Sequence, residues 1–323
     1  CCPACGSELA SDGASARCAG CGTSFRSEDG IWRLFAPHEM TEGDVTEIVK
    51  RFYEEHPFPN YDDHDSVRSL ISKSRKGIYA RLLGEQLPFN SRVLEVGCGT
   101  GQLSNFLGIS CRTVVGTDLC MNSLRMAEKF RSEYGLSRVR FLQMNLFSPA
   151  LRPEQFDVVL CNGVLHHTSD PVRGFRSIAR LVRPGGHMVI GLYNKYGRLL
   201  LDSRRVLFRA TGGRFRWIDP YLRTTPMSEG KQDAWFADQY LHPHESKHTM
   251  GELLRWFDEA NFEFVNAVPK TRPWDSFTSE ERLLEPAERG SSLDHALAEA
   301  KLFFTGSREG GFYIMIGRKR GAA

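Results

Sequence analysis

The stretch Arg92-Val93-Leu94-Glu95-Val96-Gly97-Cys98-Gly99-Thr100-Gly101 decides the fold of this chain. Its apolar half predicts a buried strand, and its glycines predict a tight turn leading into a helix that begins near Gln102. A dinucleotide-binding loop needs the spacing G-x-G-x-x-G, but Gln102 and Ser104 occupy the positions of its last glycine. A P-loop is also excluded, because Gly-Lys-Ser/Thr is missing. The turn therefore predicts close approach of the backbone to a ligand other than a pyrophosphate.

Apolar strands and helices alternate after this turn. Strands are expected at residues 113–118, 139–145, 156–162 and 187–193, and a helix at about 171–182. This alternation predicts an α/β fold with a doubly wound parallel sheet and helices on both faces. Two later runs, 262–268 and 311–317, are expected to complete the sheet as an antiparallel pair.

Three of these strands end in polar side chains. Asp118 ends the second strand, and a carboxylate there can accept hydrogen bonds from both hydroxyls of a ribose. Asn145 and Asn162 end the next two strands with side-chain amides. The predicted ligand therefore carries a sugar.

These segments resemble the successive motifs of class I methyltransferases that use S-adenosylmethionine (SAM), in particular the type 11/12-like domains, over about residues 75–195. Residues 163–167 and 191–198 resemble one bacterial subgroup, which also carries a Pro-aromatic-Pro segment like Pro57-Phe58-Pro59. The resemblance implies a Rossmann-like catalytic domain with SAM as co-substrate. The family usually has Asp at position 145, but an amide oxygen still accepts from an adenine amine. The resemblance assigns the cofactor to Glu95, Gly97, Cys98, Gly99, Gly101, Asp118, Leu119, Asn145, Leu146 and Asn162.

The N-terminus contains two matched knuckles, Cys2-Pro-Ala-Cys5-Gly6 and Cys18-Ala-Gly-Cys21-Gly22. Each Cys-x-x-Cys turn directs two sulfurs toward one centre, and four thiolates suit tetrahedral zinc. The pattern predicts one structural zinc per chain bound by Cys2, Cys5, Cys18 and Cys21, in a small zinc ribbon. Iron in a rubredoxin-like site is the alternative, since tetrahedral sulfur suits both metals.

The charge of this ribbon bears on its role. Residues 1–40 hold three Arg and five acidic residues, a balance of −2, whereas the whole chain carries +3 and the remainder therefore +5. The segment resembles zinc ribbons that precede several bacterial methyltransferase domains, including a ribosomal RNA guanine methyltransferase family. An acidic ribbon binds phosphate poorly, so a structural or substrate-docking role is favoured.

The chain divides into three expected parts. Residues 1–40 form the ribbon, residues 41–74 a linker or lid, and residues 75–323 the catalytic domain. The lid segment combines a short helix at 43–56 with a proline-stiffened aromatic stretch. Within the domain, a cap insertion is expected at about 195–245 and a helical insertion at about 270–310.

The acceptor of the methyl group is less evident. The motifs typical of exocyclic-amine and cytosine C5 methylation are missing. Candidate bases are His167, His166, Tyr193 and His242, because histidine suits proton removal near neutral pH. The alternative is that the histidines only shape the pocket.

Three functions compete. A small-molecule acceptor is favoured by the acidic ribbon, the cap and the modest charge. An RNA or protein acceptor would use the ribbon and the arginine- and aromatic-rich stretch 204–223, which is otherwise a solvated helix face. A non-catalytic SAM-binding adaptor is the third possibility, with Asn145 as its only hint.

Nine cysteines, an odd number, without a recognisable signal peptide predict a reducing, cytoplasmic setting. No apolar run is long enough to cross a bilayer, and no membrane partner is expected. The oligomeric state is not predicted.

Overall fold

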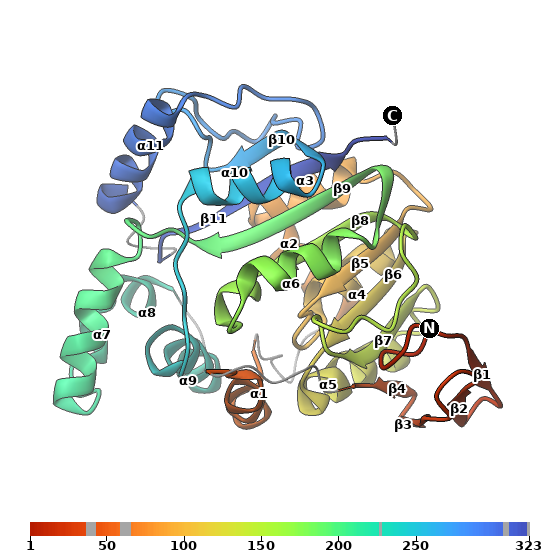
Figure 1. The fold of residues 1–323 in the computed structure, drawn as a ribbon. Helices are drawn as coiled ribbons and strands as arrows, with labels where there is room; N and C mark the ends of the chain where they lie inside the picture. Colours follow the sequence, from red (N-terminus) through yellow and green to blue (C-terminus); the bar gives the residue numbers. More distant parts are fainter. Residues whose placement is uncertain (37–42, 59–65, 226–227, 306–309, 322–323) are drawn as a thin grey trace.

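A computed structural model describes residues 1–36, 43–58, 66–225, 228–305 and 310–321. These residues form an 11-stranded sheet in the order β1-β2-β3-β4-β7-β6-β5-β8-β9-β11-β10 (Figure 1). The strands are β1 (Leu9–Ser11), β2 (Ser15–Cys18), β3 (Ser24–Glu28), β4 (Ile31–Leu34), β5 (Arg92–Val96), β6 (Thr113–Asp118), β7 (Val139–Met144), β8 (Phe156–Asn162), β9 (Val182–Tyr193), β10 (Phe262–Val268) and β11 (Phe312–Lys319). Strands β7, β6, β5, β8 and β9 are parallel, and β11 inserts antiparallel between β9 and β10. The predicted doubly wound sheet with a final antiparallel pair is confirmed.

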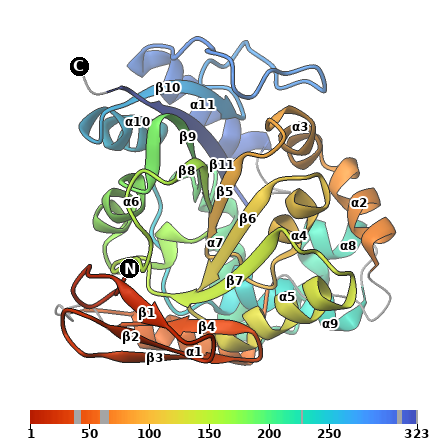
Figure 2. The ribbon, with the colours of Figure 1, turned by 90° about the vertical axis from the view of Figure 1, so that its right-hand side faces the viewer.

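Helices cover both faces of this sheet (Figure 2). The α-helices are α1 (Thr46–Glu55), α2 (Val67–Lys76), α3 (Ile78–Gln86), α4 (Gln102–Ile109), α5 (Met121–Glu133), α6 (Pro171–Ala179), α7 (Leu199–Thr211), α8 (Pro220–Thr224), α9 (Glu229–Phe236), α10 (Met250–Glu259) and α11 (Ser292–Thr305). Two short 3-10 helices are η1 (Leu165–His167) and η2 (Arg216–Ile218), and η3 (Ala237–Leu241) is a π-helix. Among the described residues, none of these helices combines the length and apolar character that a membrane span needs.

Each face of the sheet has its own apolar core. On one face, Phe175 of α6 and Phe257 of α10 pack over the buried side chains of β8 and β9. On the other, Leu83 of α3, Phe106 of α4 and Leu124 of α5 pack over β5 and β6. The near-continuous apolar runs of these strands follow from burial on both faces, as in other parallel sheets.

The N-terminal strands continue the central sheet. Strand β4 pairs in parallel with β7, with Trp32 opposite Leu142 and Leu34 opposite Met144. Phe25 and Leu34 share a buried cluster with Met144. Residues 31–34 are therefore part of the central sheet, whereas the predicted boundary between residues 40 and 41 lies outside the described residues.

The expected helical insertion at 270–310 is helical only in α11. Residues 269–291 run as turns and extended chain, because Pro273 and Pro286 cannot donate the hydrogen bonds of a helix. Instead, the side chain of Gln86 accepts from the backbone N–H of Leu283 at 2.8 Å and donates to the carbonyl of Glu281 at 2.6 Å. Hydrogen bonds to the side chain of Gln86 in α3 thus take the place of the backbone hydrogen bonds that a helix would form here.

Candidate active site

A cavity of about 340 Å³ lies at the carboxyl ends of the parallel strands. Strands β5 and β8 are neighbours there, and β5 also pairs with β6, so the chain winds in both directions from this point. Ligands bind at such switch points in open α/β sheets. All but one of the predicted cofactor residues line the cavity: Glu95, Gly97, Cys98, Gly99, Asp118, Leu119, Asn145, Leu146 and Asn162.

The glycine turn is packed as tightly as its sequence indicates. Gly97 has a φ of 69°, and a Cβ there would lie 2.2 Å from Cγ2 of Val164. Gly101, the residue that does not line the cavity, precedes α4 with a φ of 73°. A Cβ on Gly101 would lie 2.6 Å from Cβ of Ala127. Gly97 therefore shapes the cavity wall, whereas Gly101 lets α4 pack on α5.

Two carboxylates face the cavity from β5 and β6. Glu95 accepts the hydroxyl of Ser104 at 2.5 Å, and burial raises the pKa of Glu95 to about 7. Asp118 accepts the backbone N–H of Gly99 at 2.8 Å and that of Cys120 at 2.9 Å. Burial raises the pKa of Asp118 in spite of these bonds. A ligand with a positive charge and hydroxyl donors would stabilise both carboxylates.

The two asparagines differ in their hydrogen bonding. Asn145 donates to the carbonyl of Ala36 at 3.3 Å and accepts from the N–H of Phe147 at 3.0 Å. The segment after β4 is thereby tied to the cavity wall. The side-chain oxygen of Asn162 is buried and has no hydrogen-bond partner among the described residues. A buried polar atom of this kind indicates a missing ligand or water.

The predicted histidines form a chain of contacts. Nδ1 of His167 lies 2.9 Å from the carbonyl oxygen of His244, so this nitrogen carries the proton. Nε2 of His167 then accepts from Nε2 of His166, at 3.1 Å. The ring of His242 stacks on His167 with centroids 3.6 Å apart. His167 lines the cavity, whereas His166 and His242 are buried behind it.

Burial lowers the pKa of all three histidines: that of His242 to about 2, and those of His166 and His167 well below their usual range. The rings are therefore neutral at physiological pH. Since the one free lone pair of His167 already accepts a hydrogen bond from His166, this geometry favours pocket shaping over proton removal.

A polar cluster that was not expected from the sequence lines the same cavity as the predicted cofactor residues. Tyr53 of α1 donates to Oδ1 of Asp238 at 2.8 Å. The side-chain nitrogen of Gln239 donates to Oδ2 of Asp238 and to the hydroxyl of Tyr193, each at 2.8 Å. All four side chains line the cavity, and Tyr193 is the predicted one. The sequence signal for Asp238 and Gln239 was the density of polar residues in 238–245, and Tyr53 belongs to the helix expected at 43–56.

A buried ion network supports this cluster. Arg198 forms a two-pronged pair with Glu245, at 2.9 and 2.6 Å, and Arg205 contacts the same carboxylate. Arg198 also donates to the side-chain oxygen of Gln239 at 2.7 Å and stacks 3.5 Å above the ring of Tyr193. Burial opposes ionisation of Glu245, but the two guanidinium groups lower its pKa to about 2. Burial raises the pKa of Tyr193 to about 12.

Helix α1 lies over the cavity. Thr46, Val49 and Tyr53 of this helix line the cavity, together with Phe58. The Glu54 carboxylate anchors the helix, because it accepts the backbone N–H groups of Met121 and Asn122 at the start of α5. The rest of the predicted proline-stiffened lid stretch, from residue 59 on, lies outside the described residues.

Residues 94–190 match the Methyltransf_11 family, described as a methyltransferase domain. Over these residues the chain is similar to a methyltransferase domain. PKMT2 from Rickettsia typhi in complex with AdoHcy has a similar fold, with a TM-score of 0.55 and 14% identity over 82% of this chain and 56% of that one. That likeness extends the methyltransferase fold beyond the matched residues.

Two curated proteins are similar in sequence. The uncharacterized protein syc1184_c of Synechococcus is 28% identical over 255 residues, or 71% of this chain and 61% of its own length. The ubiquinone biosynthesis O-methyltransferase of Proteus mirabilis is 30% identical over 181 residues, or 56% of this chain and 64% of its own. The chain thus spans less than two thirds of the length of these relatives.

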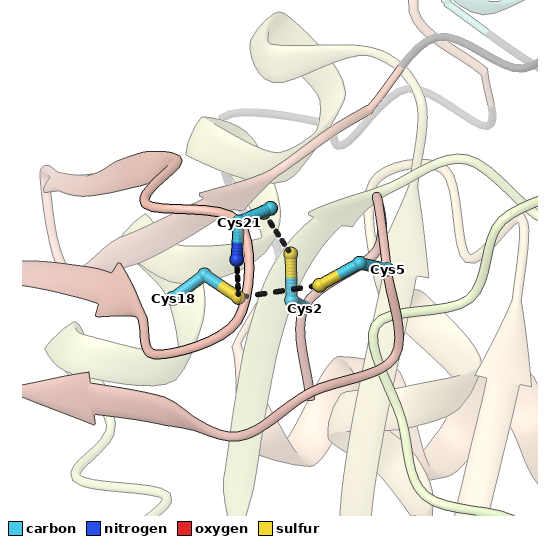
Figure 3. A group of neighbouring side chains, drawn as sticks. All are labelled: Cys2, Cys5, Cys18 and Cys21. Carbon is cyan, nitrogen blue, oxygen red and sulfur yellow. Dashed lines mark hydrogen bonds between the residues drawn. The ribbon is translucent and has the colours of Figure 1, made fainter.

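Four cysteines gather at one end of the sheet, beside the methyltransferase domain. The sulfurs of Cys2, Cys5, Cys18 and Cys21 all lie within 4.8 Å of one another, and Figure 3 shows the four side chains gathered around one point. Two of the separations are 3.7 and 3.3 Å. A tetrahedron with metal–sulfur bonds of about 2.3 Å has sulfur separations of about 3.8 Å. The donor set and its spacing therefore suit a tetrahedral metal ion.

The arginines of 204–223 do not line the cavity of the methyltransferase domain. Arg204 pairs with Asp219 at 3.5 Å, and Arg205 is part of the network at Glu245. Arg216 pairs with Asp233 at 2.7 Å and lies over the ring of Phe236. Several of the arginine side chains that could contact an RNA backbone are thus already paired with carboxylates of the same chain.

Proposed function

We propose that this protein transfers the methyl group of SAM to an oxygen of a small-molecule acceptor. One observation carries the proposal: a single cavity joins the cofactor residues of the strand ends to the polar cluster of Tyr53, Tyr193, Asp238 and Gln239. Helix α1 and the π-helix η3 contribute to the walls of this cavity, which favours an acceptor small enough to enter it. The O-methyltransferase name of the Proteus relative supports oxygen as the receiving atom.

The cofactor half of the cavity suits SAM. Asp118 would accept the ribose hydroxyls, and Glu95 would pair with the methionine ammonium group. The amide oxygen of Asn145 would accept from the adenine amine, with Leu119 and Leu146 against the ring. Bound SAM supplies a methyl group on a positively charged sulfur, and the protein's main task is to orient the two partners.

An RNA acceptor is the weaker candidate. The ribbon is acidic, and ion pairs with Asp219, Asp233 and Glu245 neutralise several arginines of 204–223. Binding to a nucleic-acid backbone depends on Lys and Arg side chains that are not already paired with acidic residues. These contacts support the small-molecule assignment.

The cysteine cluster is proposed to hold one zinc ion with a structural role. Its sulfurs converge, and β4 connects it to the sheet that carries the cofactor residues. Metal analysis of purified protein should find about one zinc per chain, and none in a Cys5→Ser, Cys18→Ser double variant. If the metal analysis instead finds iron, with the absorbance of a ferric tetrathiolate, the bound metal is iron and the zinc proposal is wrong. A zinc site of four thiolates would also fit the reducing, cytoplasmic setting that the cysteine count predicts.

Calorimetry and a transfer assay test the function. The protein should bind S-adenosylhomocysteine (SAH), the demethylated cofactor, with one site per chain. Tritium from methyl-labelled SAM should pass to the small-molecule fraction of a bacterial extract and not to its total RNA or protein. Label appearing only in RNA or protein overturns the small-molecule proposal, and absence of SAH binding overturns the enzyme assignment.

A further inference from the structure

We infer that Asp238 is the catalytic base on the acceptor side: its carboxylate takes the proton from a neutral hydroxyl as that oxygen receives the methyl group. This inference rests on the proposed function. It identifies Asp238 as the residue that contacts the acceptor. It also specifies that the reacting end of the acceptor is an uncharged hydroxyl.

The π-helix places Asp238. Helix α9 ends at Phe236, and the wider turn of η3 (Ala237–Leu241) follows directly. This turn directs Asp238 and Gln239 to the cavity, while Tyr240 packs in the cap against Phe208. Single π-turns are rare and occur often at functional sites.

The hydrogen bonds leave Asp238 able to accept one more. Each carboxylate oxygen receives one bond, Oδ1 from Tyr53 and Oδ2 from Gln239. A carboxylate has about four acceptor positions, so capacity remains on the cavity side. Arg198 fixes the amide of Gln239 by donating to its oxygen, which leaves the nitrogen to face Asp238 and Tyr193.

The same cluster favours a hydroxyl. The oxygen of Tyr193 accepts from Gln239, so its own proton is left to donate elsewhere. The Tyr193 oxygen and Oδ2 of Asp238 each lie 2.8 Å from the same nitrogen and are therefore less than 5.6 Å apart. One hydroxyl can donate to the carboxylate and accept from the tyrosine at this spacing, whereas an ammonium group can only donate.

Charge determines which acceptors enter. Glu95, Asp118 and Asp238 all line the cavity, so an anionic group next to the reacting oxygen would be repelled. Burial raises the pKa of Asp238, which makes its carboxylate a stronger base than an exposed one. The titratable and charged groups that act on it are Tyr53 from α1, Tyr193 from β9, and Arg198 and Glu245 from the cap.

The proton balance is complete without a further reactant. The acceptor O–H bond breaks, and its proton passes to Asp238. The acceptor oxygen forms a bond to the methyl carbon, while the carbon–sulfur bond breaks and leaves its electron pair on the sulfur. SAH and the methyl ether leave, and Asp238 releases the proton to solvent.

The test compares Asp238→Asn with Asp233→Asn, a matched change at an exposed carboxylate of the same cap. Probes are SAH in calorimetry, and methyl-tritiated SAM with phenol, catechol and benzyl alcohol as neutral acceptors. 4-Hydroxybenzoate serves as the anionic counterpart. We expect Asp238→Asn to reduce transfer to the neutral probes about 100- to 1,000-fold, with SAH affinity changed less than twofold. Asp233→Asn should match the wild type, and 4-hydroxybenzoate should be a poor acceptor.

The pH profile separates proton removal from positioning. The wild-type rate should fall at low pH as Asp238 becomes protonated, and Asp238→Asn should lack that limb. Tyr53→Phe removes one donor to the carboxylate, so its acid limb should move to higher pH. This second variant keeps the test valid if Asp238→Asn does not fold.

The outcomes distinguish the two proposals. Absence of SAH binding to the wild type overturns the proposed function and this inference with it. SAH binding with equal rates in the wild type and Asp238→Asn overturns the inference alone. The inference is also overturned if the SAH complex binds no neutral hydroxyl probe, measured by saturation-transfer NMR, and the protein methylates none of these probes with SAM.

Discussion

The two halves of the cavity are assembled differently. The proposed cofactor residues come from 95–162, where successive parallel strands end at one edge of the sheet. The proposed acceptor residues come from α1, β9 and η3: Tyr53 lies 185 residues from Asp238 in the sequence, and Tyr193 lies 46 residues from Gln239. The first half follows from local chain pattern, whereas the second depends on how the cap and the N-terminal helix pack.

The halves also differ in how their side chains are held. Backbone N–H groups hold Asp118 on the cofactor side. On the acceptor side, side chains hold one another, and the network ends in the buried pair of Arg198 and Glu245. A single substitution should therefore disturb the acceptor half more widely, because its supports are interdependent.

The largest expected effect is on stability. Glu245→Ala removes the carboxylate that Arg198 and Arg205 share, and the side chain of Arg198 is fully buried. Breaking a buried pair in this way costs about 3–5 kcal/mol of unfolding free energy. Urea denaturation of the two proteins measures this loss of unfolding free energy. The control is Asp258→Ala, which removes a half-exposed pair with Arg289 and should cost less than about 1 kcal/mol. Equal losses in the two variants would contradict the contrast between the halves.

The same carboxylate predicts a pH dependence. The pKa of Glu245 is lowered from an ordinary 4.5 to about 2, so its stabilisation is fully present above pH 4.5. It is lost as the pH falls from 4.5 toward 2, because the unfolded chain binds the proton first. The wild type should lose its stability advantage over Glu245→Gln across that range in urea titrations. A constant difference between the two proteins would show that the pair is not ionised.

A medium effect is expected on the cofactor side. Asp118→Ala should weaken SAH binding by about 1.5–3 kcal/mol, or roughly 10- to 150-fold, since a charged hydrogen-bond acceptor is lost. Because its supports are local backbone groups, unfolding free energy should change far less than in Glu245→Ala. Calorimetry and urea denaturation on the same preparation check both statements. Unchanged SAH affinity in a folded variant would remove Asp118 from the cofactor site.

A smaller effect is expected where the N-terminal segment meets the cofactor half. Asn145→Ala removes the bonds to Ala36 and Phe147 and, with them, the amide oxygen proposed to accept from the adenine amine. Each neutral hydrogen bond contributes about 0.5–1.5 kcal/mol, so SAH affinity should fall by roughly 2- to 10-fold. Calorimetry again provides the measurement. If Asn145→Ala reduces SAH affinity as much as Asp118→Ala does, the contact with the N-terminal segment matters for cofactor binding as much as the carboxylate at the end of β6.

The smallest effect should come from the surface of the cap. Arg216 and Asp233 are both well exposed, and such pairs contribute about 0–1 kcal/mol. Arg216→Ala should therefore leave stability, SAH affinity and methyl transfer close to wild type. A selective loss of transfer would place the 204–223 stretch in acceptor binding after all.

Several features were predictable because they depend on short-range pattern. The alternation of apolar runs predicted strands β5 to β9 and their parallel sheet, and the knuckles predicted the cysteine cluster. The histidines were located beside the cavity, but their hydrogen bonds were not foreseeable. His167 lies in η1 and His242 follows η3, and only packing brings the two rings into contact. The helical insertion at 270–310 was wrong over 269–291, where bonds to distant side chains replace helix.

The sequence alone determined the parallel sheet, its glycine turn and the polar side chains at its strand ends. The periodicity of burial and the conformational demands of glycine act over only a few residues. Tertiary structure alone decided that β4 joins β7, that Tyr53 reaches Asp238, and that Arg198 and Glu245 support them. Pairing at a sheet edge and matching of buried charges depend on three-dimensional proximity. Sequence spacing carries no information about that proximity once a loop or cap lies between the partners.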